Sequence, residues 1–372
     1  MIITINNELI DDLEVKKSFL EKIFFVNPFI INCKISTKII TVELNKNDIN
    51  IPKLKKNILK LAIRTNLTKR INNNKIFFQN NISIKNPNKN VYKNLIKSKQ
   101  INKVSDGVYI YQGNFLKTLR KIDNFFLLHG KKEGYQEVFV NETLPLSSLI
   151  NNSYLNNFPN HLFFVSNVKR DLNVLDKIST EKNFNNSFFL NKLESPKLVL
   201  SPTVCYHCFE LNKKQDLKSE ITYNVVSKCN RYESKNYKTL ERLQTFTMRE
   251  YVAYGSEIYV ENFLKKNMEK FIKIFQKLNI KFKIVSASDP FFSQDGLKKL
   301  LFQGSKTLKY EIQFYLPEEK KWLAVGSFNN HLTTLTNKYK ITKNSNLLYS
   351  GCIGFGFERF IYALISQNIK FK

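Results

Sequence analysis

The chain has 372 residues, of which 42% are hydrophobic and 13% aromatic, and 59 Lys and Arg against 31 Asp and Glu give it a formal net charge of +28. This length predicts about two domains, and the apolar content excludes a disordered chain. No apolar run approaches the roughly 20 residues that span a bilayer, and the N-terminus lacks the basic-then-apolar pattern of a signal peptide. We therefore expect a cytoplasmic protein without membrane segments.

The excess of positive charge favours a polyanionic partner, either nucleic acid or an acidic protein. Lysine supplies 51 of the 59 basic residues, and Asn and Ile are also plentiful, a bias typical of an AT-rich genome. The eight arginines are more informative, because lysine cannot replace a planar, bidentate donor at a phosphate clamp. Four of them lie in two stretches that we interpret as catalytic: Arg231, Arg242, Arg249 and Arg359.

Residues 1–104 are expected to form a smaller, basic α/β domain. Residues 37–44 alternate like a strand, residues 51–67 have the apolar spacing of a helix, and no acid occurs between Ile49 and Ser105. The acid-free stretch has two interpretations. It is either a solvated face with a flexible connector at residues 80–90, or a docking surface for an acidic partner.

Residues 105–372 are expected to form the catalytic domain. In chain order we predict a helix over 115–130 that stops at Gly130, strands over 135–145 and 195–210, a helix over 257–278, strands over 308–316 and 322–328, and a glycine-rich turn that enters a helix over 351–366. Strands that neighbour one another along the chain, with helices to one side, predict an α+β fold with an antiparallel sheet.

Residues 201–255 organise this domain. They are predicted to be two half-buried strands joined by a polar loop, with Arg231 and Glu233 on one face of the first strand. Phe246, Met248 and Glu250 share a face of the second, because side chains two apart on a strand point the same way. Such a hairpin suits a nucleotide, with Arg on a phosphate, a ring on the base and a carboxylate on the base's amino group. The alternative is a surface hairpin laced with ion pairs.

The five cysteines are an odd number in an intracellular setting, which favours metal binding or plain burial over disulfides. Cys205-x-x-Cys208 has no second CxxC to complete a structural zinc clip, so we assign Cys33, Cys208 and Cys229 to packing. The chain contains no GxxxxGK[ST], no GxGxxG opening a βαβ unit and no HExxH. Any use of ATP therefore requires another scaffold.

Three segments resemble the motifs of class II aminoacyl-tRNA synthetases. The helix and strand at residues 115–145 resemble the first motif, which builds the dimer interface, and GFGFER at residues 354–359 resembles the third. The second is resembled by four residues: Arg231, Glu233, Arg242 and Phe246. The resemblance covers residues 104–372. It implies a class II synthetase-like antiparallel sheet flanked by helices, a homodimer, and the use of ATP and Mg²⁺.

The resemblance also assigns roles. Arg231 would hold the α-phosphate of ATP and Glu233 the adenine amino group, Phe246 would stack on adenine, and Arg359 would lie beside the ring and reach the γ-phosphate. Arg231 and Arg359 are the candidate catalytic residues, and Arg242 belongs to the same ATP-binding set.

A finer resemblance concerns a metal. Cys205, Glu250 and Cys352 stand at positions similar to the zinc ligands of atypical seryl-tRNA synthetases and of their shortened relatives, the amino acid:[carrier protein] ligases. Two thiolates and a carboxylate leave one tetrahedral position open, as a working zinc site requires. In that family the open position takes the amino group of the substrate. The resemblance implies a small amino acid, glycine or alanine, with serine as a further possibility.

Three strings resemble the carrier-protein ligases more than the tRNA synthetases: residues 245–255, residues 289–292 and SFNNH at residues 327–331, which makes His331 a further candidate. The chain departs from the seryl enzymes where they keep a magnesium-binding Glu, because Ala324 stands in or near that place. Glu311, on the neighbouring predicted strand, is the candidate that replaces it.

The resemblance implies a two-step reaction. The amino acid is activated as an aminoacyl adenylate and then transferred to the phosphopantetheine thiol of a small acidic carrier protein, which a basic ligase would attract. Residues 1–104 show no long heptad arm of the kind with which seryl enzymes grip tRNA. Two alternatives stay open: tRNA aminoacylation by an atypical seryl-type synthetase, and a non-catalytic synthetase-like binding module.

Overall fold

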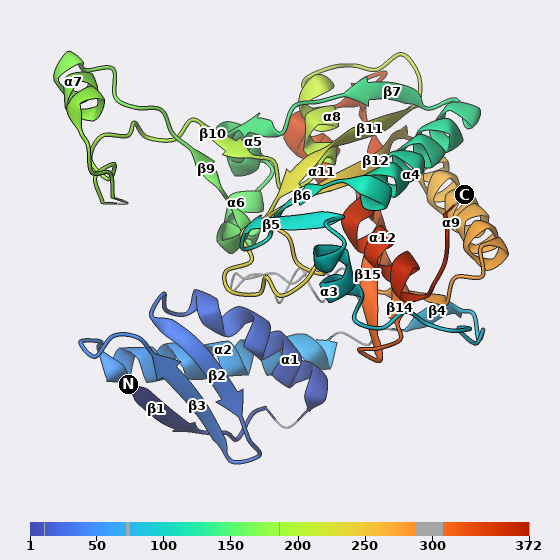
Figure 1. Ribbon diagram of the computed structural model, residues 1–372. Helices are drawn as coiled ribbons and strands as arrows, with labels where there is room; N and C mark the ends of the chain where they lie inside the picture. Colours follow the sequence, from blue (N-terminus) through green and yellow to red (C-terminus); the bar gives the residue numbers. More distant parts are fainter. Residues whose placement is uncertain (11, 72–74, 186, 288–307, 372) are drawn as a thin grey trace.

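The computed structural model describes residues 1–10, 12–71, 75–185, 187–287 and 308–371. A small N-terminal unit lies below a larger one (Figure 1). Its sheet has the order β1 (Ile2–Asn6), β3 (Ile39–Leu44), β2 (Ile30–Ile35), all antiparallel, and is covered by α1 (Leu13–Lys22) and α2 (Ile51–Ile71). The unit has a hydrophobic cluster of its own, with Phe19, Val42 and Ile58 fully buried.

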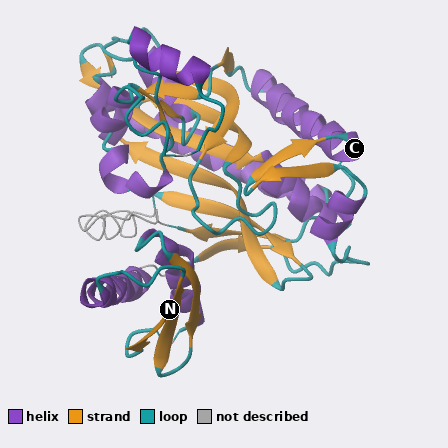
Figure 2. Cartoon of the chain, turned by 60° about the vertical axis from the view of Figure 1, so that its left-hand side comes forward, coloured by secondary structure: helices purple, strands orange, loops and turns teal. Residues whose placement is uncertain are grey.

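The larger unit is built on an eight-stranded sheet, seen as the central layer in Figure 2. Only its last pair, β7 with β11, is parallel, and the other neighbours are antiparallel. In spatial order the strands are β4 (Ile76–Gln79), β13 (Phe282–Ser286), β14 (Lys309–Leu316), β15 (Lys321–Leu332), β18 (Tyr349–Gly356), β12 (Thr245–Gly255), β11 (Ile221–Asn230) and β7 (Gln136–Phe139). The predicted α+β fold with a large antiparallel sheet is confirmed.

Three long helices cover one face of this sheet: α4 (Gly113–Lys132), α9 (Glu257–Lys277) and α12 (Phe357–Ser366). The remaining described elements are shorter. They are η1 (Ile23–Phe25), α3 (Val91–Lys97), β5 (Ile101–Ser105), β6 (Val108–Tyr111), β8 (Thr143–Pro145), α5 (Leu146–Asn151), α6 (Tyr154–Asn157), η2 (Pro159–His161), β9 (Phe164–Val165), α7 (Leu172–Thr180), β10 (Leu198–Leu200), α8 (Cys205–Leu211), α11 (Thr334–Tyr339), β16 (Thr342–Lys343) and β17 (Asn346–Leu347).

Side-chain alternation gives the sheet two distinct faces. On β12, Tyr251 and Ala253 pack into the main core under the helices, whereas Val252 and Tyr254 belong to a second hydrophobic cluster on the other face. On β18, Ile353 faces the main core, and Cys352 belongs to the second cluster. Even-numbered positions of β12 and β18 therefore carry the side chains of the second face, which holds the candidate site.

Several local predictions need correction. The segment 135–145 is two strands, because β7 pairs with β11 in the large sheet while β8 pairs with β10 in a separate small sheet. The predicted strand over 195–210 is confined to β10, and its cysteines lie on α8. The glycine-rich segment before α12 is strand β18. Its glycines allow close packing: a Cβ on Gly354 would lie 2.8 Å from the Met248 side chain.

Gly130 lies inside α4, which runs on to Lys132, so its prediction as a helix stop is wrong. A Cβ at this position would lie 2.3 Å from Asn224 Nδ2, so glycine is needed where the helix approaches β11. The left-handed backbone conformation that follows the helix is adopted by Gly134, whose φ of +76° favours glycine. The helices predicted over 51–67 and 257–278 correspond to α2 and α9.

We propose that the domain boundary lies between α2 and β4 rather than at residue 104. β4 pairs with β13 of the large sheet, and Asn80 Nδ2 donates a hydrogen bond to the Ile280 carbonyl at 2.6 Å. Val91, Leu95 and Ile101 are buried in the main core. Residues from β4 onward therefore pack as part of the larger unit.

Candidate ATP and metal site

The loop between β11 and β12 carries the candidate ATP-binding groups. β11 ends at Asn230, so Arg231 and Glu233 lie in the loop and not on the strand, which corrects the predicted shared strand face. Arg231 Nε donates to the Pro202 carbonyl at 2.9 Å, and its guanidinium lies 5.4 Å from the centre of the Phe246 ring. This contact places the arginine and the ring side by side, as a phosphate-and-base site requires.

Arg242 and Glu233 form an ion pair in the same loop. Arg242 NH1 lies 3.3 Å from both carboxylate oxygens of Glu233, and its NH2 lies 3.0 Å from Glu21 Oε2 of the N-terminal unit. Arg242 therefore faces two carboxylates from two different parts of the chain.

Arg359 enters the site from the first turn of α12. Its NH1 donates to the Ala324 carbonyl at 3.4 Å. The pKa of Arg359 is lowered to about 10, first by burial and then by the neighbouring charges of Arg242 and Arg231, against the opposing effect of Glu233. The charges of Arg231 and Arg242 thus both act on Arg359, an arrangement that an anion such as a triphosphate would relieve.

Glu311 is close enough to act electrostatically on Arg359. It lies on β14 opposite Ser327 of β15 and accepts a hydrogen bond from Gln313 Nε2 at 3.2 Å. Lys309 Nζ lies 3.9 Å from the same carboxylate. Ala324 is opposite Gln313 in the neighbouring strand. Glu311 therefore lies on the strand that pairs with Ala324, the departure from the seryl pattern, and its magnesium role stays a prediction.

Arg249 belongs to the structural core and not to this site. It lies on the odd-numbered face of β12, under the helices, where it is buried and paired with Asp123 of α4 at 2.6 Å and with Asn224 Oδ1 at 2.8 Å. Its grouping with the catalytic arginines is corrected by strand alternation, because its neighbours Met248 and Glu250 point to the opposite face.

A second cluster of polar groups lies on the same face of the sheet as Phe246. Cys205 begins α8, Glu250 is on β12 and Cys352 is on β18, and all three side chains are buried. One ligand atom from each lies within 4.8 Å of the others. Cross-strand register explains part of this meeting: Cys352 is opposite Val252, and Gly354 is opposite Glu250. The missing side chain at Gly354 leaves room beside the carboxylate, because a Cβ on the glycine would lie 3.5 Å from the carboxyl carbon of Glu250.

These donors fit a zinc ion. Three atoms within 4.8 Å of one another place a central ion at most about 2.8 Å from each, so a contraction of about half an ångström reaches the usual 2.0–2.3 Å bonds. Glu250 Oε1 accepts hydrogen bonds from Thr203 Oγ1 at 2.8 Å and Val204 N at 3.1 Å. Glu250 Oε2 is buried without a partner among the described residues. A buried carboxylate oxygen without a donor is costly, and a bound cation would satisfy it.

Further polar residues surround the cluster. Asn329 Nδ2 donates to Cys352 Sγ at 3.4 Å, and His331 Nε2 lies 3.5 Å from the same sulfur. Thr203 Oγ1 lies 3.5 Å from Cys205 Sγ. His331 was a candidate through the SFNNH resemblance, whereas Thr203 and Asn329 were missed. Asn329 stands two positions before His331 on β15, and this period-2 spacing was the signal that could have found it. No signal marked Thr203, because it lies just before α8, in a segment distant from β15 in the sequence.

His161 was also missed, because its position in the sequence suggests no triad or metal site. It ends η2, and its Nδ1 lies 3.3 Å from Tyr154 Oη. Its carbonyl accepts a hydrogen bond from the backbone N–H of Tyr232. Burial lowers the pKa of His161 to about 4, with a further contribution from the charge of Arg231. His161 is therefore a neutral neighbour of the arginine loop.

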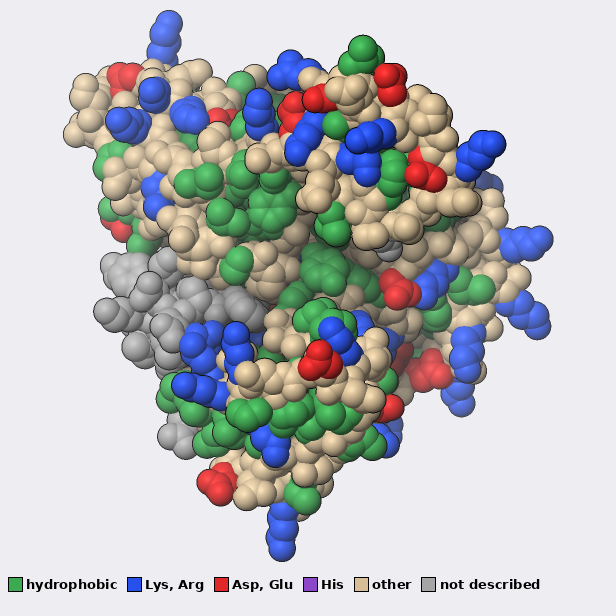
Figure 3. All heavy atoms as spheres, turned by 90° about the vertical axis from the view of Figure 1, so that its left-hand side faces the viewer, with side chains coloured by type: hydrophobic (Ala, Val, Ile, Leu, Met, Phe, Trp, Pro, Cys, Tyr) green, Lys and Arg blue, Asp and Glu red, His purple; other side chains and the backbone are tan. Residues whose placement is uncertain are grey.

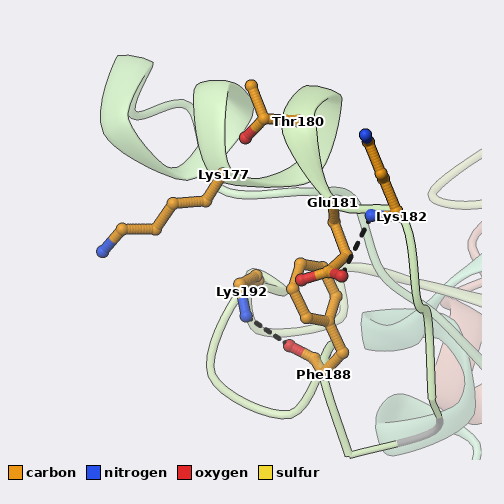
Figure 4. Close-up of a pocket in the computed structure, with 6 residues that line it drawn as sticks. All are labelled: Lys177, Thr180, Glu181, Lys182, Phe188 and Lys192. Carbon is orange, nitrogen blue, oxygen red and sulfur yellow. Dashed lines mark hydrogen bonds between the residues drawn. The ribbon is translucent and has the colours of Figure 1, made fainter.

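A surface pocket formed by α7 and the residues that follow it is separate from both clusters. It is lined by Lys177, Thr180, Glu181, Lys182, Phe188 and Lys192 (Figure 4). Lys192 Nζ donates to the Phe188 carbonyl at 2.6 Å and lies over the Phe188 ring. Figure 1 shows α7 held away from the large sheet, so this pocket is not part of the candidate active site.

The predicted string at residues 289–292 lies outside the described residues.

Comparison with known proteins agrees with this fold. Residues 188–368 match the family described as the tRNA synthetase class II core domain (G, H, P, S and T). The Methanopyrus kandleri seryl-tRNA synthetase, solved with Aquifex aeolicus tRNASec, superposes with a TM-score of 0.72 at 18% identity, covering all of this chain and 75% of that one. The match and the superposition show a class II aminoacyl-tRNA synthetase-like fold, and the ligases to which the chain is similar support an AMP-forming ligase.

Within this class, the chain is related to carrier-protein ligases and to type-2 serine–tRNA ligases. It is 28% identical over 271 residues to amino acid–[acyl-carrier-protein] ligase 1 of Bradyrhizobium diazoefficiens, covering 71% of this chain and 81% of that protein. It is 24% identical over 282 residues to the type-2 serine–tRNA ligase of Methanopyrus kandleri, covering 70% of this chain and 54% of that protein. The chain therefore spans about half the length of that tRNA ligase.

Proposed function

We propose that this protein activates a small amino acid, glycine, alanine or serine, with ATP and transfers it to the phosphopantetheine thiol of an acidic carrier protein. The observation that carries the proposal is the shared face of the sheet. It holds a buried Cys–Glu–Cys cluster and, beside it, an arginine lying over Phe246. A nucleotide and an amino acid bound at these two places would be neighbours, and the relative with carrier-protein activity supports the same assignment.

In the first step the carboxylate of the amino acid attacks the α-phosphorus of ATP, and pyrophosphate leaves. Arg231 and Arg359 would bind phosphate oxygens and neutralise the charge that develops there, while Phe246 stacks on adenine and Glu233 accepts from its amino group. Glu311 is the candidate ligand for magnesium, which would supply positive charge to neutralise the phosphates. These residues act mostly by positioning and by charge neutralisation.

Cys205, Glu250 and Cys352 would hold zinc. When bound, zinc supplies an open coordination position that takes the α-amino group of the substrate. Asn329 and Thr203 would orient the sulfur ligands through their hydrogen bonds, as polar neighbours of metal ligands commonly do. In the second step the carrier's thiol sulfur attacks the adenylate carbonyl, the thioester forms and AMP leaves.

The charge of the chain supports an acidic acceptor. Lys and Arg side chains are more numerous than Asp and Glu side chains over the face in Figure 3, in line with the net charge of +28. Opposite charges increase the rate at which such partners meet.

ATP–pyrophosphate exchange, screened over the twenty amino acids with and without a zinc chelator, tests the proposal. We expect exchange with one small amino acid and its loss on chelation. Thioester formation on a phosphopantetheinylated acidic carrier then tests the second step. If no amino acid supports exchange, the proposal fails and the chain is a non-catalytic binding module.

A second candidate function is tRNA aminoacylation. It is favoured by the superposition of the whole chain, N-terminal unit included, on a seryl-tRNA synthetase. The acid-free helix α2, with exposed Lys53, Lys56 and Lys60, also fits a phosphate backbone. Aminoacylation of tRNA-Ser that weakens steeply with added salt, without thioester formation, would decide for this function.

We also propose a homodimer formed through α4 and β7. β7 is an edge strand of the large sheet, and its Phe139 is 83% exposed. On the α4 surface, Leu128 is 54% exposed. An open strand edge beside exposed apolar side chains is a ready surface for a second chain.

None of the helices in the described residues combines the length and apolar composition that crossing a membrane requires.

A further inference from the structure

The N-terminal unit makes direct contact with the loop that carries the candidate ATP-binding residues. Lys235 Nζ donates to the Ile30 carbonyl at 2.6 Å, and Asn236 Nδ2 donates to the Glu21 carbonyl at 2.8 Å. The rings of Phe25 and Tyr232 meet edge to face with centroids 6.0 Å apart. In Figure 1 this loop hangs from the large sheet toward α1. Polar and aromatic contacts together hold the loop against the small unit.

The side chain of Glu21 makes a different contact from the rest. The contacts of Lys235 and Asn236 use backbone carbonyls of the N-terminal unit, so they tether the loop without touching its catalytic groups. The Glu21 carboxylate instead reaches Arg242, whose NH2 lies 3.0 Å from Glu21 Oε2. Glu21 lies in the last turn of α1, so the packing of the N-terminal unit fixes the backbone position from which its side chain extends.

Arg242 is thereby held at both ends of its guanidinium. NH1 faces the two oxygens of Glu233, and NH2 faces Glu21. Two separate carboxylates fix the plane of a rigid, forked donor set, which a single ion pair does not. Without Glu21, the guanidinium can rotate about its contact with Glu233, the residue proposed to recognise adenine.

We infer that Glu21 is a positioning residue for Arg242, and that the N-terminal unit is thereby a working part of the ATP site. The inference rests on the proposed function, since it assigns Glu21 to the binding of ATP. The ion pair is partly exposed, with 33% of the Arg242 and 38% of the Glu21 side chain accessible. An effect of about two- to fivefold on the KM for ATP follows from the strength of such pairs.

The test compares Glu21→Gln, Glu21→Asp and Glu8→Gln in the full chain. Glu8 is a matched control, because it is an exposed acid of the same unit for which the structure gives no contact with the loop. In pyrophosphate exchange, Glu21→Gln should raise the KM for ATP about two- to fivefold and leave the KM for the amino acid unchanged. Glu21→Asp should partly restore it, and Glu8→Gln should match the wild type.

A second readout does not depend on activity. Hydrogen–deuterium exchange of the backbone amides of residues 231–243, measured without ATP, should be faster in Glu21→Gln than in Glu8→Gln. An unchanged KM for ATP with active wild type would overturn this inference alone, and a lowered KM would do so as well, since it would mean that Glu21 competes with ATP for Arg242. Failure of the wild type to bind ATP in calorimetry would overturn both this inference and the proposed function.

Discussion

Replacing Cys352 with alanine tests the metal site most directly. Cys352 is 5% exposed, accepts a hydrogen bond from Asn329 and lies next to His331 and to the other two ligands. The change removes one thiol from a set of three protein ligands and adds no bulk. The matched control is Cys229→Ala, because Cys229 is fully buried on β11 and contacts the Met248 sulfur at 3.8 Å, outside the ligand cluster.

The size of the effect follows from the ligand count. Structural zinc sites with four ligands bind with about 10–16 kcal/mol, so one ligand contributes on the order of 3–4 kcal/mol. Losing that share weakens zinc binding about 10²- to 10³-fold. Loss of a small buried side chain costs each variant about 1 kcal/mol of folding stability, equally for mutant and control. The zinc effect is therefore well separated from the packing effect.

Zinc content per chain is measured by elemental analysis after dialysis against a weak chelator, and pyrophosphate exchange is measured on the same samples. We expect about one zinc in the wild type and in Cys229→Ala, and little zinc and no exchange in Cys352→Ala. Full zinc and normal exchange in Cys352→Ala would refute the ligand assignment. Equal loss in both variants would show that packing alone is responsible.

Three further predictions concern the arginine loop, a histidine and the sheet edge. Arg231→Lys should lower kcat/KM for ATP at least tenfold in exchange assays, because lysine cannot replace its contacts with both Pro202 and a phosphate; a change below twofold would contradict its role. His161 is neutral when folded, since burial first and Arg231 second lower its pKa to about 4, whereas the unfolded chain takes up a proton below about pH 6.5. The free energy of unfolding should therefore fall from pH 6.5 toward pH 4, by up to about 3 kcal/mol from this residue, and urea titrations of His161→Gln should show a smaller fall; an equal fall in both would exclude His161 as the cause. Phe139→Lys should shift the protein from dimer to monomer in light scattering, because it replaces an exposed hydrophobic side chain at the β7 edge with a charged one; an unchanged mass would place the interface elsewhere.

Local pattern was a good guide where short-range physics decides the structure. The apolar spacing of residues 51–67 and 257–278 predicted α2 and α9, because a helix buries one stripe of its own sequence. The alternation of Phe246, Met248 and Glu250 likewise predicted one face of β12. The rarity of arginine in a lysine-rich chain drew attention to Arg231, Arg242 and Arg359, which the fold brings into electrostatic contact.

Pattern failed where a residue's neighbours come from distant parts of the chain. Gly130 has the composition signal of a helix end, yet it lies inside α4 because β11 passes too close for a side chain. The segment 135–145 alternates like one strand, but its halves pair with different sheets. Arg249 resembles its functional neighbours in sequence and points to the opposite side. These outcomes depend on which strands pair, and pairing is a non-local choice.

The sequence by itself determined the chemical content of this protein: which side chains can bind phosphate, base and metal, and which segments can be helices and strands. Only the tertiary structure decided that Cys205, Glu250 and Cys352 meet within 4.8 Å, that Thr203 and Asn329 stand beside them, and that Glu21 of a separate unit reaches Arg242. The physical reason is that sheet register and domain packing are fixed by burial summed over the whole chain, so the neighbours of a residue cannot be read from its own segment.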